Sequence, residues 1–172
     1  MKWHVMTVLA ASVLLLQATN AYSQTGNVSF SFHATSIGGP TGEVSMTGGG
    51  TYNPVIGSLS GGGGFRCLAD INQGPLSGLK ASEGVRWHAS ELLRSTGFKC
   101  SGDASEGLKT AVTDDNTVAM TVEFYRQGDG SKPSFTAKVF ISAVDEGSDL
   151  TGVQNVWIQA VGCGEANTHF GN

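Results

Sequence analysis

The sequence predicts an all-β domain, an antiparallel barrel or sandwich of roughly 8–10 short strands. Three observations support this prediction. Apolar and polar residues alternate with a period of two along several segments. The 25 glycines cluster where turns are expected, without a collagen-like repeat. The one helical stretch, residues 89–94, is too short to be the crossover helix of a parallel sheet. We favour a closed barrel over a sandwich, because glycines permit the bulges and tight coiling of a sheet that closes on itself.

Residues 1–21 have the features of a secretory signal peptide. Lys2 and His4 give a weakly positive start, residues 5–16 are mostly apolar, and small residues at Thr19 and Ala21 suit cleavage. This apolar run would span about 18 Å as a helix, which is too short for a hydrocarbon core of roughly 30 Å. We therefore expect one secreted or periplasmic domain over residues 22–172, with no transmembrane segment after cleavage. The short signal is typical of a bacterial protein.

The strands of the N-terminal half are expected to be short and separated by turns rich in glycine. A four-glycine run, residues 61–64, leads into a strand-like segment. Ser90 could cap the short helix over residues 89–94. The expected strands cover residues 28–35, 44–47, 51–53, 65–71, 85–88, 98–101 and 108–113.

The C-terminal half contains the clearest strands. Residues 117–125 and 135–143 alternate in the same way and flank a linker rich in turn-forming residues, so they predict an antiparallel hairpin. A last strand over residues 153–161 carries apolar residues in both phases, which indicates that both of its faces are covered.

The three cysteines, Cys67, Cys100 and Cys163, leave one thiol unpaired in a monomer. Cys67 and Cys100 each lie two residues after a phenylalanine, so each shares the face of an apolar side chain in a strand. We therefore predict a Cys67–Cys100 disulfide, which would close a loop of about 34 residues. Cys163 is then a small buried residue, the true partner of one of the others, or a reactive or intermolecular thiol.

Candidate ligand-binding residues lie in the central segment, where polar side chains are interleaved with apolar ones. If the barrel is hollow, these groups would line a pocket. If it is filled, Arg66 and Arg86 would simply face water. His88 and Glu91 share the spacing of some metal-binding helices, but no second copy completes a site, so two solvated residues are expected. The candidate set is Arg66, Asp70, Arg86, Trp87, His88 and Glu91.

No catalytic, metal or cofactor motif is apparent. The four-glycine run lacks the lysine and hydroxyl residue of a phosphate-binding loop. The acidic segments 114–116 and 145–149 do not have the ligand spacing of a calcium loop, so ordinary solvated turns are expected. A nucleophile-elbow sequence is also missing.

The net charge of −4 and the absence of basic runs argue against a nucleic-acid partner. The leading hypothesis is a secreted, non-catalytic barrel that binds a small apolar or amphipathic ligand or a protein partner. A second is a small secreted isomerase, cyclase or hydrolase, in which His88, Asp70 or Glu123 would act inside a pocket. A third is a structural subunit of the cell surface, linked through strand edges or the odd cysteine.

Overall fold

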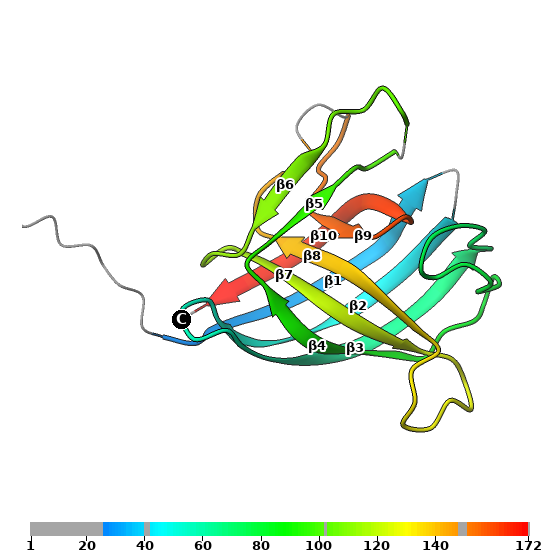
Figure 1. Ribbon diagram of the computed structural model, residues 1–172, viewed down its shortest axis with the longest axis horizontal. Coiled ribbons are helices and arrows are strands. Elements are labelled where there is room, and N and C mark those ends of the chain that lie inside the picture. Colours follow the sequence, from blue (N-terminus) through cyan, green and yellow to red (C-terminus); the bar gives the residue numbers. More distant parts are fainter. Residues whose placement is uncertain (1–25, 40–41, 102, 148–150, 172) are drawn as a thin grey trace, which may run out of the picture.

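The computed structural model describes residues 26–39, 42–101, 103–147 and 151–171 (Figure 1). The predicted signal peptide lies outside these residues. The described chain forms ten strands and no helix, and so it holds no helix long and apolar enough to cross a membrane. The strands are β1 (Val28–Gly39), β2 (Gly42–Asn53), β3 (Ser58–Ala69), β4 (Arg86–Leu93), β5 (Ser95–Phe98), β6 (Lys109–Val112), β7 (Thr117–Tyr125), β8 (Phe135–Ser142), β9 (Val156–Ile158) and β10 (Gly162–Gly171).

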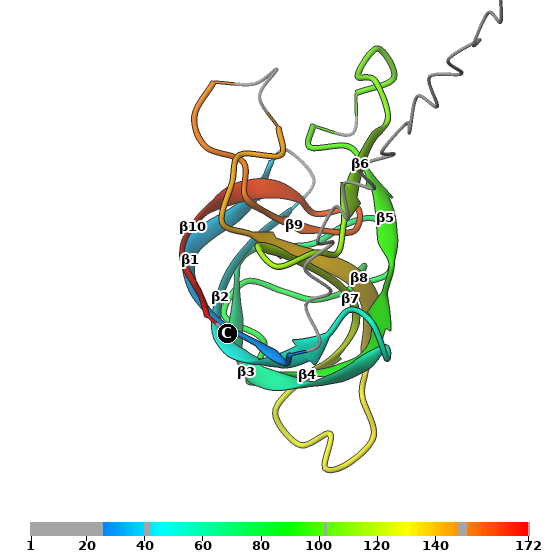
Figure 2. The ribbon, with the colours of Figure 1, turned by 90° about the vertical axis from the view of Figure 1, so that its left-hand side faces the viewer.

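Eight of the strands close into an antiparallel barrel, as predicted, in the order β1-β10-β9-β8-β7-β4-β3-β2. Figure 2 shows the ring of strands. β5 and β6 form a separate two-stranded ribbon. We call residues 95–112 the arm; Figure 1 shows the ribbon standing beside the barrel, above β8, β9 and β10.

The barrel interior is packed with apolar side chains. Successive side chains of a strand point to opposite faces, so every second residue points into the barrel. Phe30 and Phe32 on β1 and Phe124 on β7 are examples, and each is nearly inaccessible to solvent. Trp87 on β4 is completely buried: its ring lies 5.9 Å from that of Phe32, and its Nε1 donates a hydrogen bond to the carbonyl of Thr47 at 2.9 Å. The inward-facing residues of the described strands therefore form one apolar core inside the barrel.

Glycines make room for Trp87. Gly48 on β2 lies opposite Gly63 on β3, and a Cβ atom on either would come within 2.6 and 2.8 Å of the Trp87 ring, respectively. The run at residues 48–50 pairs with residues 61–63, so both glycine-rich runs lie inside long strands. The two short strands expected over residues 44–47 and 51–53 are therefore one strand, β2.

A second apolar core lies outside the barrel, under the arm. Phe98 and Ala111 on the arm pack against Phe140 and Trp157 on the outer faces of β8 and β9. The Trp157 Nε1 donates to the carbonyl of Lys99 at 2.9 Å. All three residues of β9 are buried, so the expected coverage of this strand on both faces is confirmed.

The helix predicted over residues 89–94 is wrong, because residues 89–93 belong to β4 and Arg94 is a bend that follows it. β4 pairs with β3 on one side and β7 on the other, and a bulge shifts the register between Ala89 and Glu91. Ala89 and Leu92 both pack against the barrel core. Because of the extra residue in the bulge they are three positions apart, a spacing that is typical of a helix. Pairing with β7, which continues to Leu93, outweighs the local helical propensity.

The predicted β7–β8 hairpin is confirmed, with Thr117 opposite Ser142 and Phe124 opposite Phe135. The last predicted strand is shorter than expected, and the chain then turns into β10. β10 was not predicted, because its inward positions include Gly164 and Ala166 and therefore lack the bulky apolar residues that mark the other strands.

Candidate functional site

The structure does not bring the six predicted ligand-binding residues together. Trp87 is in the barrel core, whereas Arg66 is exposed on the outer face of β3. Asp70 forms an ion pair with Lys80 at 2.9 Å and accepts a hydrogen bond from the Ala81 amide. The Ala81 hydrogen bond and Lys80 lower the pKa of Asp70. These contacts hold the β3–β4 connection.

Arg86 and His88 both lie against the ring of Tyr125 on the outer wall of the barrel. The Arg86 guanidinium lies 4.2 Å from the centre of the Tyr125 ring, and the His88 ring lies 5.2 Å from it. The Tyr125 hydroxyl donates to Glu123, and this hydrogen bond raises the pKa of Tyr125. Tyr125 is only 3% exposed, so its ring is covered and offers no face to a ligand.

Glu91 lies on the same outer wall but apart from this group, and its carboxylate accepts a hydrogen bond from Thr121 at 3.1 Å. Apart from Arg66, the predicted residues therefore make contacts within the barrel core, the barrel wall or the β3–β4 connection.

An external groove is the strongest candidate site. It has a volume of about 450 Å³ and lies where the base of the arm faces the β2–β3 turn. Three segments that are distant in the sequence form it: the turn itself, the end of β4 with the residue that follows, and the end of β6. We call it the arm groove; it is lined by Pro54, Val55, Ile56, Gly57, Leu92, Leu93, Arg94, Val112 and Thr113.

The β2–β3 turn presents aliphatic side chains to this groove. The Asn53 side chain accepts hydrogen bonds from the amides of Val55 and Ile56, and Gly57 adopts a φ of 74°, which favours glycine. The backbone amides of Val55 and Ile56 are thus hydrogen-bonded within the turn, while the side chains remain at the surface: Val55 is 62% exposed and Ile56 is 74% exposed. Val112, across the groove, is 56% exposed. Exposed aliphatic residues that gather around one cavity mark interaction sites more often than isolated ones do.

Hydrogen bonds at the arm base fix the opposite wall of the groove. The Thr113 hydroxyl donates to the Leu93 carbonyl at 2.6 Å and accepts from the Ala119 amide at 3.0 Å. The Thr113 amide donates to the Arg94 carbonyl at 2.9 Å. The two ends of the arm are thus tied together at the groove.

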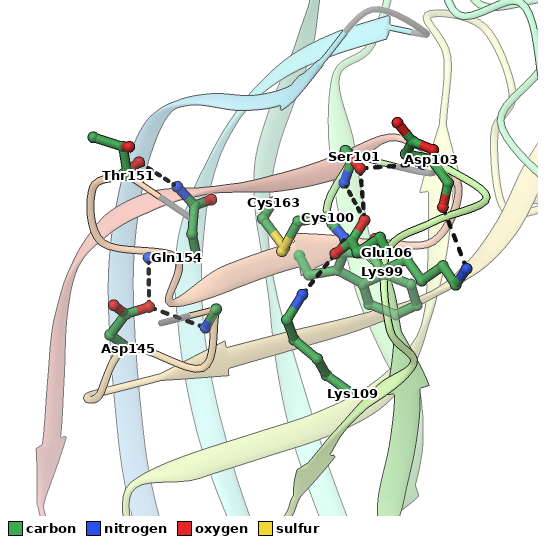
Figure 3. Close-up of a disulfide and its surroundings, with 12 residues drawn as sticks. Lys99, Cys100, Ser101, Asp103, Glu106, Lys109, Asp145, Thr151, Gln154 and Cys163 are labelled. Atoms are coloured by element: carbon green, nitrogen blue, oxygen red, sulfur yellow. Dashed lines mark hydrogen bonds and ion pairs between the residues drawn. A yellow bond between two sulfur atoms is a disulfide. The ribbon is translucent and has the colours of Figure 1, made fainter. Parts of the chain in front are cut away.

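A disulfide holds the arm to the barrel, and it differs from the predicted one. Cys100, just after β5, is bonded to Cys163 on β10 (Figure 3). The predicted Cys67–Cys100 pair is wrong because the phenylalanines beside these cysteines face different cores. Phe65 and Cys67 face the barrel interior, whereas Phe98 and Cys100 face the core under the arm.

Cys67 is therefore the unpaired cysteine. It is 1% exposed, and burial raises the pKa of its thiol to about 11. Both properties suppress the thiolate and make this residue unreactive in the folded protein.

Glu106 organises the loop between β5 and β6 (Figure 3). Its carboxylate accepts hydrogen bonds from the amides of Cys100 and Ser101 and from the Ser101 hydroxyl, and it pairs with Lys109 at 2.6 Å. Burial by itself raises the pKa of Glu106, but these contacts outweigh it and lower the pKa to about 2. The charged form of Glu106 thus stabilises the arm next to the disulfide.

Carboxylates of both acidic segments bind groups of the protein itself, and Glu146 accepts a hydrogen bond from the Ser142 hydroxyl at 3.1 Å. Residues 148 and 149 of the second segment lie outside the described residues. Asp114 accepts a hydrogen bond from the Asn116 amide, and Asp145 accepts from the amides of Gly147 and Gln154. Within the part of the chain that the structure describes, no group of three or more His, Cys, Asp or Glu side chains could hold a metal ion.

Comparisons of the chain with protein-family models, with curated proteins and with solved structures found no match. The candidate site therefore rests on its own geometry. Sequence reasoning missed it, although one signal was present: Val55 and Ile56 are bulky and apolar, yet they lie between Pro54 and Gly57 in a segment with the composition of a turn.

Proposed function

We propose that this protein is a secreted, non-catalytic barrel that binds a small apolar or amphipathic molecule in the arm groove. The observation that carries the proposal is the cluster of exposed Val55, Ile56 and Val112 around a cavity of about 450 Å³. Sites for small molecules commonly have volumes of about 300–1,000 Å³, and the arm groove falls within this range. The packed barrel interior favours a binding site on the outside.

The Cys100–Cys163 disulfide supports export, because disulfides persist in oxidising compartments. Residues 1–21, which have the features of a signal peptide, also support export. The geometry gives less support to the other two hypotheses. Asp70 is engaged in an exposed ion pair, Glu123 accepts from Tyr125, and Cys67 is too buried to link subunits.

Calorimetric titration with octanol tests the proposal. We expect saturable binding with one site, and about fivefold weaker binding by Ile56→Ser, because an apolar side chain in contact with a ligand contributes roughly 1 kcal/mol. Ile56 is mostly exposed, so this change should leave the fold intact. Leu68→Ser is the matched control, since Leu68 is 44% exposed near the far end of β3. Absence of binding, or equal weakening by both variants, would refute the proposal.

A further inference from the structure

We infer that the ligand of the arm groove is an amphipathic carboxylate, whose carboxylate binds Arg94 and whose aliphatic tail lies against Val55, Ile56 and Val112. This inference rests on the proposed function and adds the chemical class of the ligand.

Arg94 supplies the polar recognition. It follows β4 directly, lines the groove and is exposed, and its guanidinium forms no hydrogen bond or ion pair with any described residue. Two other arginines are occupied: Arg86 lies over Tyr125 and donates to the Gly130 carbonyl, and Arg126 lies over Phe135. A free guanidinium beside the exposed aliphatic side chains of Ile56 and Val112 suits an amphipathic carboxylate, which it can hold by two parallel hydrogen bonds.

Aliphatic side chains that line the groove suit an aliphatic tail. Leu92 and Leu93 line it and are partly buried, Leu92 against the barrel core and Leu93 against the core under the arm. Ile56 and Val112 line the same groove and are exposed. A tail placed there would cover apolar surface that is now open to water, which is favourable.

Nearby acidic residues define the competing possibility. Asp114 and Asp115 follow Thr113 directly and would favour an alkylammonium ligand. They do not line the groove, and the Asp114 carboxylate accepts a hydrogen bond from the Asn116 amide. Arg94 is the charged side chain that lines the groove, so the geometry favours the anion.

The test compares octanoate, octanol and octylamine at pH 7 by calorimetry, with the wild type, Arg94→Gln and Lys132→Gln. We expect octanoate to bind most tightly. Arg94→Gln should weaken octanoate binding about tenfold, the size of one charge-assisted hydrogen bond, and leave octanol binding unchanged. Lys132→Gln removes the same charge from an exposed loop outside the groove, and it should change neither octanoate binding nor octanol binding.

Every other outcome contradicts either the carboxylate inference or the proposed function. Equal binding of octanoate and octanol, or equal effects of the two charge variants, would overturn the carboxylate inference and leave the proposed function standing. Tighter binding of octylamine would do the same and assign the site to a cation. Absence of binding by all three probes would overturn the proposed function itself.

Discussion

At the scale of single residues, the fit between Trp87 and its facing glycines decides whether the barrel can close around a filled core. A Cβ atom on Gly63 would lie 2.0 Å from the Thr47 carbonyl oxygen and 2.8 Å from the Trp87 Nε1. A Cβ atom on the adjacent Gly64 would find its nearest contact at 3.6 Å, which is ordinary packing. Neighbouring glycines of one run therefore have different roles.

Gly63→Ala should accordingly destabilise the protein by more than about 2 kcal/mol, because the clash includes backbone atoms that cannot move aside. Gly64→Ala should stay within about 1 kcal/mol of the wild type and could even stabilise it by restricting the unfolded chain. Urea unfolding of both variants measures the difference. Similar midpoints for the two would contradict the packing described for Trp87.

At the scale of elements, the arm depends on the charge of Glu106. The folded-state pKa of about 2 is lower than the ordinary 4.5, so the contribution of Glu106 to stability is complete above pH 4.5 and is lost as the pH falls towards 2. We expect Glu106→Gln to unfold at lower urea than the wild type at pH 6. The difference between the urea midpoints of the two proteins should shrink steadily as the pH falls from 4.5 to 2. A difference that does not change with pH would show that Glu106 acts through packing alone.

The elements also show what the sequence could and could not predict. β7 and β8 were predicted because they pair with each other along their length and most of their residues alternate between apolar and polar. Phe140 breaks the alternation of β8 because it faces the core under the arm. β4 was mistaken for a helix because its bulge interrupts the alternation. The disulfide was mispaired because alternation tells which residues share a face, and a barrel with an arm has two buried faces.

At the scale of the whole molecule, closure of the barrel moves the candidate site to the outside. The arm groove draws on residues 54–57, 92–94 and 112–113, which come together only after the barrel has closed and the arm has folded against it. Sequence reasoning placed the ligand among residues 66–91 because their polar and apolar side chains alternate. In the structure that segment comprises the end of β3, the β3–β4 connection and most of β4, and its buried apolar residues face the barrel core while most of its polar residues face solvent.

The central claim is that the binding surface lies outside a packed barrel. A nuclear magnetic resonance titration of the ¹⁵N-labelled protein with octanoate tests it most directly, because every backbone amide reports on its own surroundings. We predict saturable shifts at Val55, Ile56, Arg94 and Val112, with little change at Phe32 and Phe124 inside the barrel. Shifts concentrated at the inward-facing residues of the barrel would contradict the account, because the ligand would then occupy an interior that we describe as filled.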